Sequence, residues 1–199
     1  MQLDKLKKEM PMLDQEELGM VIGGDRYCFD KSGHLYNTIA DDNVNEIYVD
    51  GAKKPYTIVD SGTAIHTGVG AHSGVSIDGA DKKLFEYMAD NTDVEWGYSY
   101  NGNGKSYTGK LNTDNDRMSV EMSPHKGYKN YVHNHPNGTR LCDDEDFNTM
   151  YNFTYAEGKY TSQYNYKNFE LYTKDQDGQH YDLLENLERI YNHSGLSNW

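Results

Sequence analysis

Residues 131–147 read YVHNHPNGTRLCDDEDF and contain two histidines, a turn and a group of acids. His133 and His135 are two residues apart, so on a β-strand both imidazoles point to one face, about 6–7 Å apart along the chain. Two such imidazoles can share a metal ion, but an isolated H-x-H is weak evidence because solvated strand histidines also occur in pairs. Pro136-Asn137-Gly138 then ends the strand and turns the chain. The stretch therefore predicts a strand and a turn, with a metal site as one interpretation.

Four acids follow the turn, where a helix is expected to begin near Asp144 and run to about Tyr155: Asp143, Asp144, Glu145 and Asp146. The exposed amides of a helix N-terminus favour negative side chains, so capping alone can account for these acids. If the helix start packs near the end of the strand, one carboxylate also reaches the histidines. Two histidines and one carboxylate leave a fourth tetrahedral position for water, which is the pattern of catalytic zinc.

The segments around this stretch predict an α+β fold. Residues 25–60 carry short aromatic or β-branched runs between turns and read as a β-meander, while the Gly/Ser-rich residues 61–79 predict a loop and a short strand. Further strands are expected over 94–100, 105–111, 117–122, 128–134 and 159–173, and helices over 79–91, with Asp81 as its cap, and 181–193. We therefore expect a β-rich N-terminal extension over 25–78 and a second domain over 79–199.

The composition limits the classes of function. The chain has 199 residues, with 19 Lys plus Arg against 32 Asp plus Glu, which gives a formal net charge of −13. Such an acidic chain repels phosphate backbones, which argues against general nucleic-acid binding. No apolar run approaches the ~20 residues that span a bilayer. The two cysteines, Cys28 and Cys142, are too few to define a disulfide framework; we expect free buried thiols, although a bridge after export stays open.

The spacing of the histidines and acids resembles the motif of the JAMM (JAB/MPN) metallopeptidases. That motif is H-x-H, seven residues, Ser, two residues and Asp, preceded by a glutamate on an earlier strand. Seven residues separate His135 from Asp143, and two more lead to Asp146. The segment DNTDVEWGY supplies Glu95 and Gly97 in the context of the family's glutamate. The resemblance covers roughly residues 75–175 and is strongest to JAB-like domains at the ends of bacterial polymorphic toxins.

The resemblance implies a mixed β-sheet flanked by helices and a zinc site that hydrolyses peptide or isopeptide bonds. His133, His135 and Asp146 would hold Zn²⁺, and Glu95 would act as the general base. Asp143 stands where the family has a serine that helps to stabilise the oxyanion, and Asn134 stands where Ser or Thr is usual. Asp143 therefore puts catalysis in question.

The N-terminal segment MLDQEELGMVIGG, residues 12–24, resembles a double-glycine export leader. The matching positions are Leu13, Glu17-Leu18, Val21, Gly23 and Gly24, while Asp14 replaces the usual serine. The resemblance implies that the peptidase domain of an ABC exporter cleaves after Gly24 and that the remainder is secreted. The alternative is an ordinary N-terminal helix that ends at the two glycines.

Three functions stay open on the sequence. The first is a secreted zinc peptidase, an interbacterial toxin or effector that acts on a peptide or protein substrate and would need an immunity protein. The second is a JAMM-like binding module without peptidase activity, which Asp143 keeps in play. The third is a metal-dependent nuclease toxin, because His-Asn-His beside a turn can mimic a nuclease finger. The acidic composition and the placement of Glu95 count against the third.

Overall fold

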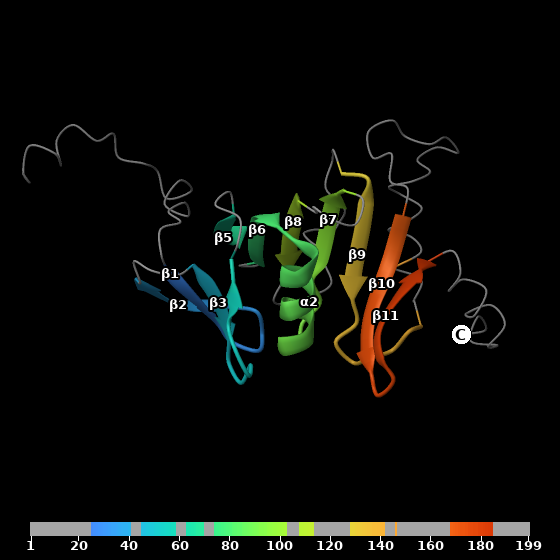
Figure 1. Ribbon diagram of the computed structural model, residues 1–199, viewed down its shortest axis with the longest axis horizontal. Coiled ribbons are helices and arrows are strands. Elements are labelled where there is room, and N and C mark those ends of the chain that lie inside the picture. Colours follow the sequence, from blue (N-terminus) through green and yellow to red (C-terminus); the bar gives the residue numbers. More distant parts are fainter. Residues whose placement is uncertain are drawn as a thin grey trace, which may run out of the picture.

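The computed structural model describes residues 25–40, 45–58, 63–69, 74–102, 108–113, 128–141, 146 and 168–184. In this part of the chain the polypeptide forms two β-sheets and one helix (Figure 1). The fold is therefore mostly β. The predicted mixed sheet is present, but among the described residues only one predicted helix lies against it. In the described ranges that helix is too short and too polar to cross a bilayer.

A four-stranded sheet is built from the N-terminal residues. Its strands are β1 (Asp25–Phe29), β2 (Leu35–Ala40), β3 (Glu46–Val49) and β4 (Tyr56–Thr57). Their order is β2-β1-β3-β4, with β1 antiparallel to β2 and parallel to β3. The predicted meander is therefore wrong, because a meander would place β2 between its neighbours in sequence. The buried side chains explain the order: Ile47 and Val49 of β3 are fully buried, whereas β2 exposes Tyr36 and Ile39 and lies at the edge.

A seven-stranded sheet is built from the described residues that follow. Its strands are β5 (Ala64–Val69), β6 (Gly74–Ala80), β7 (Gly97–Asn101), β8 (Thr108–Thr113), β9 (Asn130–Asn134), β10 (Asn168–Asp175) and β11 (Gly178–Leu183). They follow the order β11-β10-β9-β7-β8-β6-β5. The pair β9 and β10 is parallel and the other pairs are antiparallel, so the sheet is mixed.

The helix α2 (Lys82–Asn91) lies against one face of this sheet (Figure 1). Asp81 caps it, since its carboxylate accepts a hydrogen bond from the Leu84 amide at 2.8 Å, which confirms the predicted helix and cap. Phe85 of α2 stacks on Tyr98 of β7 and meets the ring of Tyr172 of β10 edge-on. These aromatic contacts fix which face of β7, β9 and β10 is turned towards the helix.

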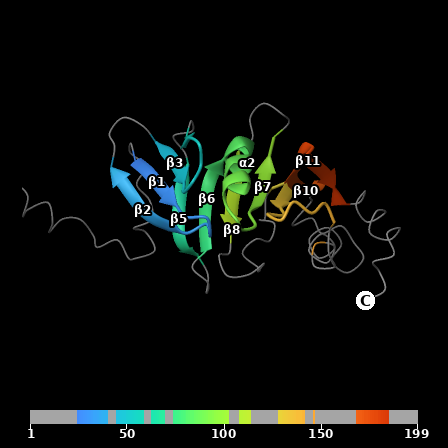
Figure 2. The ribbon, with the colours of Figure 1, turned by 90° about the horizontal axis from the view of Figure 1, so that it is seen from below.

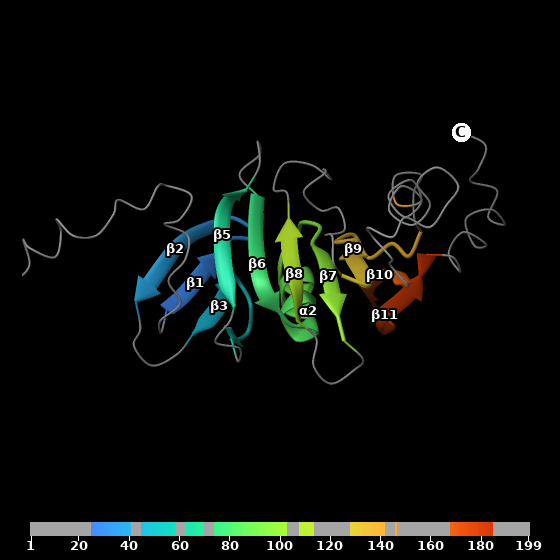
Figure 3. The same cartoon turned by 90° about the horizontal axis from the view of Figure 1, so that it is seen from above.

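One hydrophobic core connects the two sheets. Its buried members come from β1 and β3 as well as from α2 and the seven-stranded sheet. Phe29 of β1 packs edge-on against Trp96, which is fully buried just before β7. The four-stranded sheet lies beside β5, on the side of the molecule away from β10 and β11 (Figures 2 and 3). The proposed domain boundary between residues 78 and 79 stays a prediction.

Two other sequence predictions are corrected. Residues 61–79 were expected to form a loop and one short strand, but β5 and β6 form an antiparallel pair there. The helix expected over 181–193 cannot begin at Tyr181, because residues 181–183 belong to β11. Tyr181 pairs with Tyr172 across the sheet, and its hydroxyl donates to Glu86 of α2 at 2.7 Å. This burial of an aromatic pair outweighs the helical spacing of the leucines; residues 185–193 lie outside the described chain.

The remaining expected elements are partly covered by the described residues. β8 and β10 fall within two to three residues of the strands expected around 105–111 and at the end of 159–173. The strand expected over 117–122 lies outside the described residues. So does nearly all of the helix expected over 144–155, of which only Asp146 is described.

Candidate metal centre

β9 carries His133 through the middle of the sheet and ends one residue before His135. All five of its residues are buried between β7 and β10. His133 lies opposite Gly97 of β7 and Leu171 of β10. These two residues are next in sequence to Tyr98 and Tyr172, which face α2. Because strand side chains alternate, His133 points to the sheet face opposite α2. The predicted strand therefore delivers His133 to the side of the sheet away from the helix.

The chain turns immediately after His135, as the Pro-Asn-Gly sequence predicts. The His135 amide still donates to the Tyr172 carbonyl at 3.2 Å, which keeps this residue attached to β10. The Gly138 amide then donates back to the His135 carbonyl at 3.1 Å. Gly138 has φ +72°, a backbone conformation that favours glycine, and a Cβ there would lie 3.2 Å from the Lys174 carbonyl oxygen. The turn holds the second histidine beside the first.

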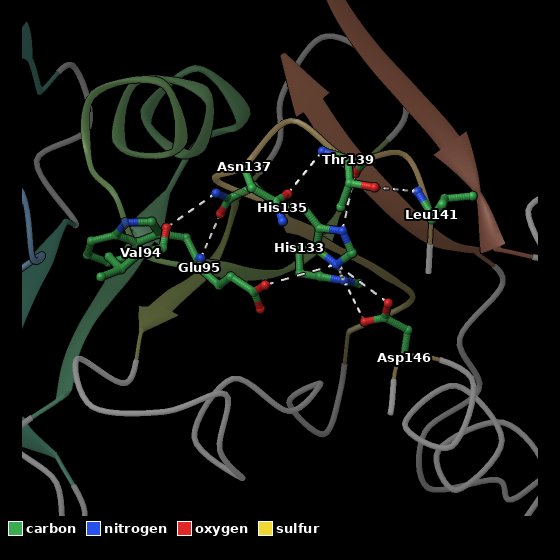
Figure 4. Close-up of polar contacts among 10 residues, drawn as sticks. Val94, Glu95, His133, His135, Asn137, Thr139, Leu141 and Asp146 are labelled. Atoms are coloured by element: carbon green, nitrogen blue, oxygen red, sulfur yellow. Dashed lines mark hydrogen bonds and ion pairs between the residues drawn. The ribbon is translucent and has the colours of Figure 1, made fainter. Parts of the chain in front are cut away.

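His133, His135 and Asp146 converge in one buried group (Figure 4). The Nε2 atoms of the two histidines are 3.3 Å apart. Asp146 Oδ1 lies 2.8 Å from Nε2 of His133, and its Oδ2 lies 3.5 Å from Nε2 of His135. The ligand atoms of a tetrahedral zinc site, each about 2.0–2.2 Å from the ion, are about 3.3–3.5 Å from one another. Two of the three distances fall in this range and the His133–Asp146 distance is shorter, so the group has the donor types, and nearly the spacing, of a site that could hold a metal ion.

The charges of the group favour a cation. Burial raises the pKa of Asp146, but the hydrogen bonds and charges of His133 and His135 outweigh burial and hold this pKa well below its usual range. Burial lowers the pKa of His135, but Asp146 first and Glu95 next outweigh it, so the pKa of His135 is raised. Asp146 is therefore ionised at neutral pH, the form in which a carboxylate binds metal.

A backbone carbonyl fixes the orientation of His135. Its Nδ1 lies 3.2 Å from the Thr139 carbonyl oxygen (Figure 4). A carbonyl only accepts hydrogen bonds, so Nδ1 carries the proton and Nε2 offers its lone pair to the centre of the group. Metal-ligating histidines usually have such a partner on the second nitrogen. Sequence reasoning missed Thr139, because a backbone carbonyl can come from any residue type.

An ion pair holds the loop that carries Thr139. Arg140 donates to both carboxylate oxygens of Asp182 on β11, from Nε at 2.8 Å and from Nη2 at 2.6 Å. The Thr139 amide donates to Asn137 Oδ1 at 3.0 Å, which closes the turn from the other side. Arg140 and Asp182 are 42 residues apart, and no sequence pattern links them. The ion pair between Arg140 and Asp182 therefore holds this loop in a way that the sequence does not indicate.

Glu95 lies directly before β7 with its carboxylate turned towards the imidazoles (Figure 4). Its Oε1 is 4.0 Å from Nε2 of His135, and its side chain is 15% exposed. It is farther from His135 than the Asp146 carboxylate is. This placement suits a group beside a metal site rather than a ligand within it. The structure therefore brings the sequence-predicted glutamate to the predicted ligands across a separation of 38 residues from His133.

Other candidate residues lie elsewhere or outside the described chain. Asp143, Cys142 and the leader residues, including Gly23 and Gly24, lie outside it, so their predicted roles stay predictions. Cys28 is a buried free thiol. Three histidines away from the group each pair with a nearby aspartate: His34, His66 and His180.

A mixed sheet that carries a buried His-His-Asp group, with a glutamate beside it, suggests a metallohydrolase. Residues 75–163 match the model of the family JAB-like toxin 1, and this part of the chain is a JAB-like toxin domain. No curated protein and no solved structure matched the chain. The matched range contains Glu95, His133, His135 and Asp146.

Proposed function

We propose that this chain is a zinc-dependent peptidase or isopeptidase and acts as an interbacterial toxin or effector. One observation carries the proposal: His133, His135 and Asp146 form a buried group that could hold a metal ion, and Glu95 lies beside it. The JAB-like toxin domain that contains these residues supports the class of reaction.

Each residue of the group would have a distinct role in this reaction. His133, His135 and Asp146 would hold the ion, and a bound zinc ion supplies Lewis acidity and lowers the pKa of water. Glu95 would accept a proton from the attacking water and pass it to the leaving amine. At 4.0 Å from His135 Nε2, its carboxylate lies beside the ligands, beyond hydrogen-bonding distance of this atom. The Thr139 carbonyl holds His135 in the orientation that binding requires.

The site supports hydrolysis only if Asp143 permits it. This residue stands at the position of the motif serine, and an ionised aspartate cannot donate a hydrogen bond to an oxyanion. The specific alternative is therefore a JAB-like binding module that keeps the metal site and does not cleave its target.

Secretion is part of the proposal. The leader-like residues 1–24 would direct the chain to an ABC exporter with a leader peptidase, and the remainder would act on peptide or protein substrates. β1 begins at Asp25, and the Asp25 amide donates to Asn45 Oδ1 at 3.2 Å. Cleavage after Gly24 would leave all of the described residues of this strand in the secreted chain. An acidic toxin of this kind would need an immunity protein in the producing cell.

Metal analysis of purified protein tests the first half of the proposal. We expect one zinc ion per chain, lost in His133→Ala, His135→Ala and Asp146→Ala, because each substitution removes a ligand. His180→Ala is the matched control: this histidine also pairs with a carboxylate, Asp175 at 3.0 Å, but away from the group. Stoichiometric zinc in a variant that lacks both His133 and His135 would contradict the site.

Hydrolysis assays test the second half. A panel of peptides, isopeptide-linked substrates and DNA is offered to the protein and to Glu95→Gln. We expect cleavage of peptide or isopeptide bonds but not of DNA. Glu95→Gln should keep its zinc and lose about 10²- to 10⁴-fold in kcat, because an amide cannot accept the proton. A zinc-loaded protein that cleaves nothing in the panel would favour the binding module.

A further inference from the structure

The middle residue of the H-x-H stretch holds the segment that carries Glu95. Asn134 is 2% exposed and lies opposite Tyr172 of β10, so it points to the α2 side of the sheet while His133 points to the other. It therefore cannot reach the metal site with its own side chain. Its side chain bonds instead to Trp96 and Val94, which precede β7.

Both ends of the Asn134 amide bond to the backbone on either side of Glu95. Its Oδ1 accepts from the Trp96 amide at 2.7 Å, and its Nδ2 donates to the Val94 carbonyl at 3.3 Å. The Asn134 backbone amide also donates to the Trp96 carbonyl at 3.3 Å. Figure 4 shows Val94 and Glu95 side by side at this position. The peptide units before and after Glu95 are thus both attached to Asn134.

These bonds extend the sheet beyond the end of β7. The register of β7 and β9 ends at the pair Gly97 and His133. In a regular antiparallel pair, Trp96 and Asn134 would exchange two backbone hydrogen bonds. Here the side-chain oxygen of Asn134 receives the Trp96 amide, so the chain before Trp96 can leave the strand direction and still be held. The same register, continued by two residues, places Glu95 opposite His135, so the bonds from Asn134 hold Glu95 near that position.

Trp96 provides the fixed point of this arrangement. Its side chain is fully buried, and its indole Nε1 donates to Thr92 Oγ1 at 2.8 Å. Asn134 joins this anchored residue to β9. A planar amide offers its acceptor and its donor on two separate atoms, whereas the hydroxyl of Ser or Thr offers one oxygen. An asparagine can therefore bond to Trp96 and Val94 through two separate atoms, whereas Ser or Thr would have to bond to both through one oxygen.

We propose that Asn134 is a positioning residue that sets the place of Glu95 relative to the histidines. This inference rests on the proposed role of Glu95 as the general base. Because Asn134 lies between His133 and His135 in the chain, it connects the base directly to the strand that carries two ligands. A misplacement of about 1 Å in a catalytic group can cost about 10²-fold in rate.

The test compares Asn134→Leu and Asn134→Ser with Asn130→Leu. Leucine is similar in size to asparagine and removes both side-chain hydrogen bonds, while serine is the second variant should the leucine variant fail to fold. Asn130 is the matched control: it is a buried asparagine on the same strand, and its Nδ2 donates to the Tyr100 carbonyl at 3.2 Å, away from Glu95. Circular dichroism checks that each variant folds.

Three measurements separate positioning from a general structural role. We expect the Asn134 variants to keep full zinc content and near-normal KM while kcat falls about 10- to 100-fold. In a Glu95→Gln background the same substitutions should cause no further fall, because they act through Glu95. Asn130→Leu should leave kcat unchanged. An additional loss in the Glu95→Gln background, loss of zinc, or an unchanged kcat would overturn the inference.

A structural readout keeps the inference testable if no substrate is cleaved. In crystal structures of the protein and of Asn134→Leu or Asn134→Ser, we expect the Glu95 carboxylate to move away from His135 by about 1 Å or more. It should stay in place in Asn130→Leu. An unmoved Glu95 in the Asn134 variants would refute positioning by Asn134. Absence of hydrolysis in the parent would instead count against the proposed function alone.

Discussion

Asp143 decides between the enzyme and the binding module at the scale of a single residue. A donor at this position is useful because charge develops on the oxyanion in the transition state. An ionised aspartate would repel that charge, so it must point away and cap the helix, become protonated among the neighbouring carboxylates, or join the metal as a further ligand. We expect capping, because aspartate is a good N-cap and a helix is predicted to start here.

The capping role predicts the result of Asp143→Ser. Serine also caps helices and can donate a hydrogen bond, so the variant should keep its zinc and hydrolyse peptide at least as fast as the parent. Zinc analysis and peptide cleavage are the measurements. The same substitution three residues later, Asp146→Ser, is the contrast and should lose zinc.

Two other results would each exclude this role. If Asp143→Ser loses zinc, Asp143 is a ligand and the analogy with the motif serine is wrong. If Asp143→Ser creates activity that the parent lacks, the natural protein is a binding module.

At the scale of elements, the loop 136–141 joins three strands around the metal centre. It leaves β9 at His135, contacts β10 through Gly138, and is held to β11 by Arg140 and Asp182. The loop places the Thr139 carbonyl where it orients His135. The pair is partly exposed, with 44% of the Arg140 side chain accessible, so its own contribution to stability is small. Its importance should therefore appear in metal binding.

Arg140→Ala is expected to weaken zinc binding more than it weakens the fold. Loss of the tether frees the loop and the partner of His135, and loss of such outer partners typically costs about 10- to 100-fold in metal affinity. The free energy of unfolding should change by less than about 1 kcal/mol. Competition with a chromophoric chelator measures the affinity, and denaturant titration of the metal-free protein measures stability.

Lys174→Ala is the control for this loop. Lys174 forms a comparable surface pair, with Asp90 at 2.6 Å, but its side chain does not bind the loop. Its replacement should leave zinc affinity unchanged. Equal losses of affinity in the two variants would show that the Arg140 tether has no special role.

At the scale of the whole molecule, the two sheets share one core. Phe29 of the four-stranded sheet packs against Trp96, two residues before Tyr98 of the aromatic stack on β7. The same Trp96 is bound to Asn134, which lies between His133 and His135 in the chain. The N-terminal sheet is therefore packed against the segment that carries Glu95. We expect the two sheets to unfold together.

A pair of isoleucines tests this cooperation. Ile47 is fully buried on β3, and Ile39 is 46% exposed on β2 of the same sheet. Ile47→Ala should lower the free energy of unfolding by about 2–5 kcal/mol, whereas Ile39→Ala should change it by no more than about 0.5 kcal/mol. Denaturant titration followed by tryptophan fluorescence and by circular dichroism should give one coincident transition. Two transitions, with only the first moved by Ile47→Ala, would indicate separate domains.

Export is also a property of the whole molecule. Cleavage after Gly24 should leave Asp25 as the new N-terminus, because the spacing of the leader-like residues places the two glycines at the processing site. Mass spectrometry of the secreted protein measures this end. An intact N-terminus or a cut elsewhere would refute the leader.

Local patterns in the sequence were enough to predict the elements that are stabilised by interactions between residues close in sequence. Helix α2 was predictable because its apolar spacing and the Asp81 cap act within a few residues. The strand under His133 and His135, and the turn after it, were predictable because strand side chains alternate and Pro-Asn-Gly ends a strand. The match to a family motif then named Glu95 and Asp146, which spacing alone would not have chosen.

Only the tertiary structure decided the contacts that join distant segments. The parallel pairing of β1 with β3 and the strand formed by residues 181–183 depend on which side chains the core can bury, and periodicity in one segment carries no such information. The bond of Arg140 to Asp182, and the Asn134 amide that spans Glu95, connect residues about 40 positions apart. Such bonds follow from strand order and register, since hydrogen bonds form only between groups that the fold has already placed within about 3 Å of one another.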